Sequence, residues 1–220
     1  MSAIVCLPGL GADEGLFSPQ LDAFDNAIVP AWPDTSGVRT VEGLADAHLT
    51  RLLDDGHWTE GLTLVGFSFG GQVALSMTHL AIRRGSPLPS RLVLLSAPRT
   101  RAQITRAFRA QVVVSRLIPA HVIAWAARTL VAPGFARACA LDEPQTEDLR
   151  AMARRLEAPL FKRLARIAPR WGFDDQQSRA ILDAGIDVRH LHSLRDPVIP
   201  PPPRETAGVE FLPERAHLLT

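Results

Sequence analysis

A short glycine-rich segment in the first third of the chain holds the serine with the clearest chemical context. Gly66-Phe67-Ser68-Phe69-Gly70 has the spacing G-x-S-x-G, between the apolar run Leu62–Val65 and the helical pattern Gln72–Arg84. A nucleophile on a sharp turn from strand to helix crowds its neighbours, and glycine at both flanking positions relieves the crowding. The N–H groups at the start of the following helix favour negative charge there. Ser68 is therefore the predicted nucleophile, and the alternative is a glycine-rich helix start with an incidental serine.

A serine hydroxyl needs a base that takes its proton and a third group that orients the base. Asp196 follows the strand pattern Asp187–Leu194 by two residues, at the edge where open parallel sheets gather catalytic groups. Its alternative role is to cap a turn. His217 comes after the last strand pattern and completes the chain order Ser, Asp, His, although six other histidines compete with it. These positions predict a Ser68–His217–Asp196 triad.

Acyl transfer also needs backbone N–H groups that stabilise an oxyanion. One expected donor is Phe69, the residue after the nucleophile, and the other is Leu10 in Pro8-Gly9-Leu10-Gly11, a loop that can equally be a plain tight turn. The apolar neighbours Phe67 and Trp125 suggest a hydrophobic substrate site. Phe67 and Phe69 are equally compatible with a core position.

Strand and helix patterns alternate along the first 98 residues. Short apolar runs at 3–7, 27–32, 62–65 and 91–96 predict strands, and amphipathic repeats at 40–53 and 72–84 predict helices. This alternation favours a parallel sheet with helices on both faces. Residues 99–186 break it with helical patterns at 101–117, 120–131, 145–157, 159–168 and 174–184. We therefore divide the chain into a core, 1–98, a helical insertion, 99–186, and the rest of the core, 187–220.

The order of these features resembles the α/β-hydrolase superfamily along nearly the whole chain. The resemblance implies a minimal α/β fold: a mostly parallel, doubly wound sheet of about six strands with a helical cap inserted at 99–186. It also implies Ser68 as nucleophile, His217 as general base and acid, and Asp196 as the group that orients the histidine. Three features depart from the family. Pro8 stands where histidine is usual, the first two family strands are lacking, and the sequence ends three residues after His217, where members continue into a closing helix.

Composition excludes several other classes of protein. The 220 residues are 46% hydrophobic and 21% charged, with a net charge of +1, which is typical of one soluble globular domain. The two cysteines, Cys6 and Cys139, form no metal or disulfide pattern, so no metal or organic cofactor is implied. We expect no membrane span and no secretory signal, and hence a cytoplasmic protein.

The insertion is basic, with 14 basic and 5 acidic residues between positions 99 and 170. Small α/β-hydrolases that demethylate pimeloyl-carrier-protein esters resemble this layout, so an acidic carrier protein is one expected partner. The other interpretation is a solvated, arginine-rich face. Nucleic acid is not expected as a partner, because no nucleic-acid-binding motif accompanies the basic residues.

The predicted reaction is cleavage of a carboxylic ester or thioester through an acyl-enzyme on Ser68. Alternatives are an esterase for carrier-protein-bound substrates, a non-catalytic binding protein of the same fold, and carbon–carbon hydrolysis or perhydrolysis on the same scaffold.

Overall fold

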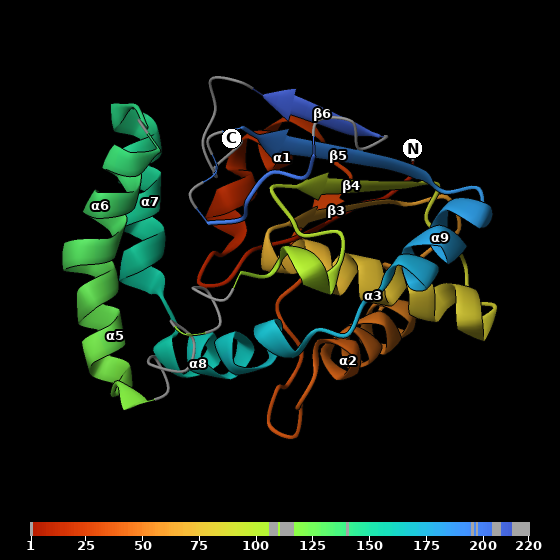
Figure 1. The fold of residues 1–220 in the computed structure, drawn as a ribbon, viewed down its shortest axis with the longest axis horizontal. Helices are drawn as coiled ribbons and strands as arrows, with labels where there is room; N and C mark the ends of the chain where they lie inside the picture. Colours follow the sequence, from red (N-terminus) through yellow and green to blue (C-terminus); the bar gives the residue numbers. More distant parts are fainter. Residues whose placement is uncertain are drawn as a thin grey trace.

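The centre of the fold is a six-stranded sheet in which every strand runs parallel to its neighbours, in the order β2-β1-β3-β4-β5-β6 (Figure 1). This computed structural model describes residues 2–105, 110, 117–139, 141–194, 196, 198–203 and 208–212. The strands are β1 (Ile4–Leu7), β2 (Ala27–Ile28), β3 (Thr63–Phe67), β4 (Arg91–Leu95), β5 (Asp187–Ser193) and β6 (Val209–Leu212). The predicted α/β fold class is confirmed.

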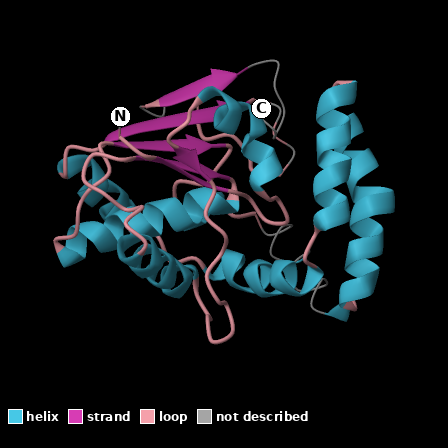
Figure 2. Ribbon diagram, turned by 180° about the vertical axis from the view of Figure 1, so that it is seen from behind, coloured by secondary structure: helices cyan, strands magenta, loops and turns pink. Residues whose placement is uncertain are grey.

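One face of the sheet is covered by helices α2 (Val41–Asp54), α3 (Phe69–Arg84) and α9 (Asp175–Asp183) (Figures 1 and 2). Helix α2 begins where the Thr40 hydroxyl accepts the Gly43 N–H at 3.0 Å, a side-chain cap for a helix start. Its residues Leu44 and Leu49 are fully buried, because the apolar positions of α2 repeat at three- and four-residue spacing. The main hydrophobic core lies between these helices and the sheet.

The opposite face carries a smaller apolar cluster around the helical segments η1 (Glu14–Phe17) and α1 (Ser18–Ala23). Cys6 of β1 and Phe67 of β3 lie in this cluster with Met152, which comes from the inserted helices. Met152 thus places part of the insertion on the same side of the sheet as the segment that follows β1.

Most of the insertion lies beyond the carboxyl ends of the strands (Figure 1). A long helical rod, formed by α5 (Ala120–Ala126), η3 (Ala127–Val131) and α6 (Ala132–Ala138), stands beside α7 (Glu143–Arg155). Helix α8 (Ala158–Ile167) leads from this pair back toward the core. The middle segment η3 is a π-helix that ends two residues before Pro133. Because proline has no N–H, it cannot continue an ordinary helical hydrogen-bond ladder. The short helical turn η4 (Ala168–Arg170) follows α8 directly.

The structure differs from the sequence prediction in several elements, and helices α1 and α6 have no counterpart in that prediction. The strand expected at 27–32 is only two residues long, because Pro30 cannot donate to a strand ladder. Of the helix expected at 101–117, the short helical turn η2 (Arg101–Gln103) is present, and most of the remainder lies outside the described residues. The last helix of the insertion, α9, packs on α3. The boundaries drawn at 98 and 186 stay a prediction.

Candidate active site

Ser68 occupies a backbone conformation that is uncommon for a residue with a side chain. Its φ is 51° and its ψ is −113°, between the end of β3 and the start of α3. A non-glycine residue in the left-handed region is strained, and such strain is often found at functional positions. The Ser68 N–H donates to the Leu95 carbonyl at 2.9 Å, and the Ser68 carbonyl accepts from Gly71 N–H at 3.0 Å. The turn is thus held from both sides.

The glycines around Ser68 are required by close backbone approach. A Cβ atom on Gly70 would lie 2.0 Å from the Leu7 carbonyl oxygen, and one on Gly66 would lie 2.6 Å from the Gly71 Cα. These distances are far shorter than any real carbon contact. The glycine spacing seen in the sequence therefore lets the first turn of α3 pack directly against the end of β1. Ser68 lies immediately before this turn.

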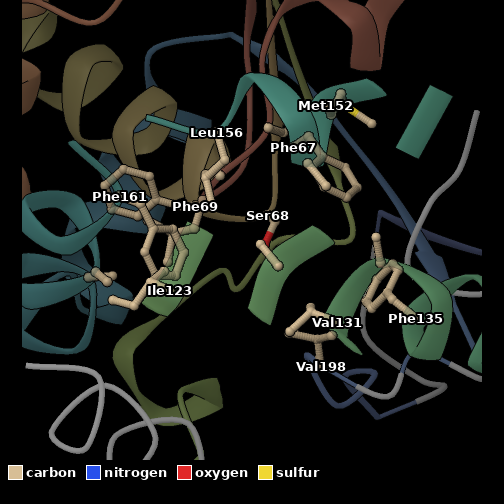
Figure 3. Close-up of a pocket in the computed structure, with 18 of the residues that line it drawn as sticks. Phe67, Ser68, Phe69, Ile123, Val131, Phe135, Met152, Leu156, Phe161 and Val198 are labelled. Carbon is tan, nitrogen blue, oxygen red and sulfur yellow. The ribbon is translucent and has the colours of Figure 1, made fainter. Parts of the chain in front are cut away.

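Ser68 opens into a cavity of about 540 Å³, a size typical of small-molecule sites. Figure 3 shows the Ser68 hydroxyl in the middle of a ring of apolar side chains, among them Phe161 and Phe135. The lining comes from the Leu10 loop, the Ser68 turn, the inserted helices and the loop after β5. The lining residues are Leu10, Gly11, Ala12, Leu16, Phe67, Ser68, Phe69, Gln72, Gln103, Ile104, Thr105, Ile118, Val122, Ile123, Ala126, Ala127, Val131, Ala132, Phe135, Leu149, Met152, Ala153, Leu156, Phe161, Ala165, Ala168, Val198 and Ile199.

The two expected oxyanion donors lie at this cavity. Leu10 and Phe69 both line it together with Ser68. Phe69 is the first residue of α3, so its N–H has no carbonyl one turn earlier within the helix. The structure therefore brings the backbone segments of the predicted oxyanion hole to the nucleophile, and their role as donors stays a prediction.

The two aromatic residues expected to contact the substrate lie in different places. Phe67 lines the cavity and is also part of the smaller core cluster, and its contact with a substrate stays a prediction. Trp125 is 57% exposed and is not among the lining residues. The lining residues of α5 are Val122, Ile123 and Ala126. A role of Trp125 as a substrate contact stays a prediction.

Asp196 lies in the loop after β5 with its side chain completely buried. Its Oδ1 accepts the backbone N–H groups of Val198 at 2.8 Å and Ile199 at 2.9 Å, which is the turn-capping role that the sequence left open. Its Oδ2 lies 3.6 Å from His192 Nε2. Val198 and Ile199 line the cavity, so the carboxylate fixes a loop that forms part of the cavity wall. His217 lies outside the described residues, and its pairing with Asp196 stays a prediction.

Two buried histidines of β5 stand behind the Asp196 loop. His192 Nε2 lies 3.0 Å from the Ile199 carbonyl oxygen, and His190 Nε2 lies 3.1 Å from His192 Nδ1. Because a carbonyl only accepts, His192 carries a proton on Nε2, and one of the two imidazoles donates to the other across the His190–His192 contact. Burial, followed by the proximity of His192 and Arg99, lowers the pKa of His190 to about 3. The two imidazoles form a hydrogen-bonded chain that ends on the loop after β5.

Comparison with known protein families agrees with the fold and with the position of Ser68. The model of a family described as "Alpha/beta hydrolase family" matches residues 4–220. The chain belongs to this alpha/beta hydrolase family. No curated protein sequence matches it significantly. Among the described residues of this hydrolase, no helix has the length and apolar character needed to cross a membrane. Those same residues bring no three His, Cys, Asp or Glu side chains together as a metal site requires.

Solved structures that are similar to this hydrolase share its fold at low sequence identity. RedJ, a thioesterase from the prodiginine biosynthetic pathway of Streptomyces coelicolor, is 21% identical, with 98% of this chain and 78% of that chain covered and a TM-score of 0.64. A thermophilic esterase from Thermogutta terrifontis is 19% identical over 99% and 83%, with a TM-score of 0.67. The meta-cleavage product hydrolase CumD from Pseudomonas fluorescens IP01 is 17% identical over 99% and 84%, with a TM-score of 0.68.

Acidic side chains pair with several arginines of the hydrolase's insertion. Arg150 and Arg154 lie within ion-pair distance of Glu147 on the same helix, and Arg155 Nε lies 2.7 Å from an Asp13 carboxylate oxygen. The last pair joins α7 to the loop before η1. These three charges are thus partly compensated within the hydrolase itself.

The buried His190 predicts that the hydrolase loses stability in acid. Its pKa is about 3 in the folded state against 6.5 in the unfolded chain, so below pH 6.5 only the unfolded chain takes up this proton. The free energy of unfolding should therefore fall by about 1.4 kcal/mol per pH unit on this account as pH drops from 6.5 toward 4. His190→Gln keeps an N–H near His192 and removes the titration. Urea unfolding at several pH values should give a shallower acid slope for this variant.

The comparison above pH 7 is the internal control for His190→Gln. There the difference in unfolding free energy between wild type and variant should be constant, because neither state binds the proton. An acid slope equal to that of the wild type would contradict the assignment of His190 as a buried neutral imidazole.

Proposed function

We propose that this protein is a serine hydrolase that cleaves a carboxylic ester or thioester through an acyl-enzyme on Ser68. One observation supports the proposal most strongly. Ser68 has a strained backbone directly before helix α3, and it lines a cavity whose wall is mostly apolar. An apolar cavity fits an acyl chain, and the serine fits the carbonyl at its end. Similar folds include an esterase and a thioesterase.

In the proposed mechanism the Ser68 hydroxyl attacks the substrate carbonyl and gives its proton to His217. The negative oxygen of the tetrahedral intermediate accepts from the N–H groups of Leu10 and Phe69. Collapse of the intermediate breaks the bond to the leaving alcohol or thiol, which receives the proton from His217. A water molecule, activated by the same histidine, then attacks the acyl-enzyme and releases the acid, while Asp196 orients the imidazole.

A series of p-nitrophenyl esters of increasing acyl length tests the proposal. Because each methylene moved from water into an apolar wall contributes about 0.8 kcal/mol, kcat/KM should rise about fourfold per added methylene until the cavity is filled. A fluorophosphonate probe should label the protein at Ser68. A well-folded protein that neither turns over any ester of the series nor reacts with the probe would point to the non-catalytic binding function.

A carrier protein as the leaving group is a second candidate. The excess of 14 basic over 5 acidic residues at 99–170 favours an acidic partner. The ion pairs of Arg150, Arg154 and Arg155 compensate part of that positive charge. We therefore propose that an acidic partner contacts the exposed Arg137 and Arg166. Carbon–carbon hydrolysis is a further alternative for the same triad, and product analysis separates it from ester cleavage.

A further inference from the structure

His192 of β5 lies directly behind the loop that holds Asp196. Its side chain is fully buried, and it is not among the residues that line the cavity, so it cannot reach a substrate as a general base would. Both ring nitrogens nevertheless have a close neighbour. Nδ1 lies 3.1 Å from His190 Nε2, and Nε2 lies 3.0 Å from the Ile199 carbonyl oxygen. The imidazole therefore cannot turn without losing both contacts.

The backbone of Ile199 is held at both of its polar groups. Its N–H donates to Asp196 Oδ1 at 2.9 Å, and its carbonyl oxygen accepts from His192 Nε2. Asp196 Oδ1 also accepts the Val198 N–H at 2.8 Å. The side chains of Asp196 and His192 are both completely buried. The carboxylate and the imidazole are thus joined through a single loop residue, in a place where a lost hydrogen bond is costly.

His192 does not itself bind the second oxygen of the carboxylate. The distance from His192 Nε2 to Asp196 Oδ2 is 3.6 Å, which is longer than a hydrogen bond, whereas the Ile199 carbonyl lies at 3.0 Å. The Nε2 proton is therefore directed at the loop backbone. A carboxylate that orients the base of a triad must keep one oxygen for that base, and this arrangement supports Asp196 without competing for that oxygen.

On the basis of the proposed function, we propose that His192 is a positioning residue that holds Asp196 where it orients the catalytic histidine. His192 acts through the Ile199 carbonyl, and His190 fixes the orientation of the His192 ring from the other side. Loops are the more mobile parts of a fold, so a carboxylate on a loop benefits from an anchor in the sheet. A displacement of about 1 Å at a catalytic group can lower the rate about 100-fold.

Two variants, His192→Met and His192→Leu, remove the N–H and keep an apolar side chain in the buried position. Their kcat on the best p-nitrophenyl ester should fall roughly 10- to 100-fold. The kcat is expressed per active site, counted by fluorophosphonate labelling carried to completion, so that misfolded protein does not enter the comparison. Either variant with a native circular dichroism spectrum is sufficient. A fall of less than threefold would overturn the inference.

The pH profile distinguishes positioning from a general loss of structure. A nearby carboxylate raises the pKa of an imidazole, so the acid limb of kcat/KM should move to lower pH by about half a pH unit or more when Asp196 is displaced. The other groups beside His192 are His190 and, acting on His190 from the loop after β4, Arg99. Loss of a positive charge at His192 would move the limb to higher pH. An unmoved limb, or one moved to higher pH, would overturn the inference.

A conservative variant and a matched control complete the series. His192→Gln keeps a side-chain N–H for the Ile199 carbonyl and should restore kcat and the acid limb to within about threefold of the wild type. His57→Met makes the same chemical change at an exposed position and should leave both unchanged. A His192→Gln protein as impaired as His192→Met would mean that the N–H is not what matters, and would overturn the inference.

Amide hydrogen exchange separates this inference from the proposed function, because it needs no turnover. The N–H groups of Val198 and Ile199, which Asp196 holds, should exchange roughly 10-fold faster in His192→Met than in the wild type. Faster exchange in a protein without any ester turnover would support the anchoring of the loop and refute the proposed catalysis. Turnover that depends on Ser68, combined with unchanged exchange and an unmoved acid limb, would overturn the role of His192 and leave the serine hydrolase intact.

Discussion

Ser68→Ala is expected to reduce ester turnover by roughly 10⁴- to 10⁶-fold, because no other step of the proposed mechanism can proceed without the attacking oxygen. The variant keeps the Cβ atom and therefore the backbone strain at φ 51°. Its unfolding free energy should stay within about 0.5 kcal/mol of the wild type. Initial rates on the best p-nitrophenyl ester, together with urea unfolding of the same samples, measure both quantities.

A matched serine separates the loss of the nucleophile from a general effect of the substitution. Ser36 is exposed and does not line the cavity, so Ser36→Ala should retain full turnover and fluorophosphonate labelling. Turnover by Ser68→Ala within tenfold of the wild type, or labelling of that variant at the wild-type rate, would be incompatible with an acyl-enzyme on Ser68.

The sequence predicted the Ser68 turn because its geometry is local. Glycine at positions 66 and 70, after an apolar strand and before a helix, leaves few alternatives for the backbone, and the structure has Ser68 in that conformation. The parallel pairing of the strands also followed from a local pattern, the alternation of short apolar runs with helices, whereas the order of the strands in the sheet is known only from the structure. What the pattern could not supply was the length of β2, where a proline stops a strand whose apolar run continues.

Features that depend on packing between distant segments were not predicted. Trp125 has the residue type of a substrate contact, but which side of α5 meets the cavity depends on how the inserted helices rest on the core. The hydrogen-bonded pair His190 and His192 shows an alternation signal, since both share one face of a strand. No pattern in the sequence indicates that His192 contacts the loop that holds Asp196.

Gly70→Ala is expected to have the largest effect on stability. The added Cβ would meet the carbonyl oxygen of Leu7 at 2.0 Å and that of Pro8 at 2.7 Å. These atoms are backbone at the end of β1, so they cannot move aside like the tip of a side chain. Either α3 is pushed away from the sheet or β1 loses its register, and both disturb the main core. We expect a loss of about 4 kcal/mol or more in the unfolding free energy.

The same chemical change should have the opposite sign at Gly134. This glycine lies within α6, and a Cβ built on it meets nothing within 4 Å. Alanine is a better helix former than glycine by about 1 kcal/mol, so Gly134→Ala should leave stability unchanged or raise it by up to that amount. Urea unfolding of both variants measures the contrast. A loss below about 1 kcal/mol for Gly70→Ala would mean that β1 and α3 do not approach as closely as described. In that case, the Leu10 loop would have no fixed position beside Ser68, and an oxyanion hole made from Leu10 and Phe69 would lose its structural basis.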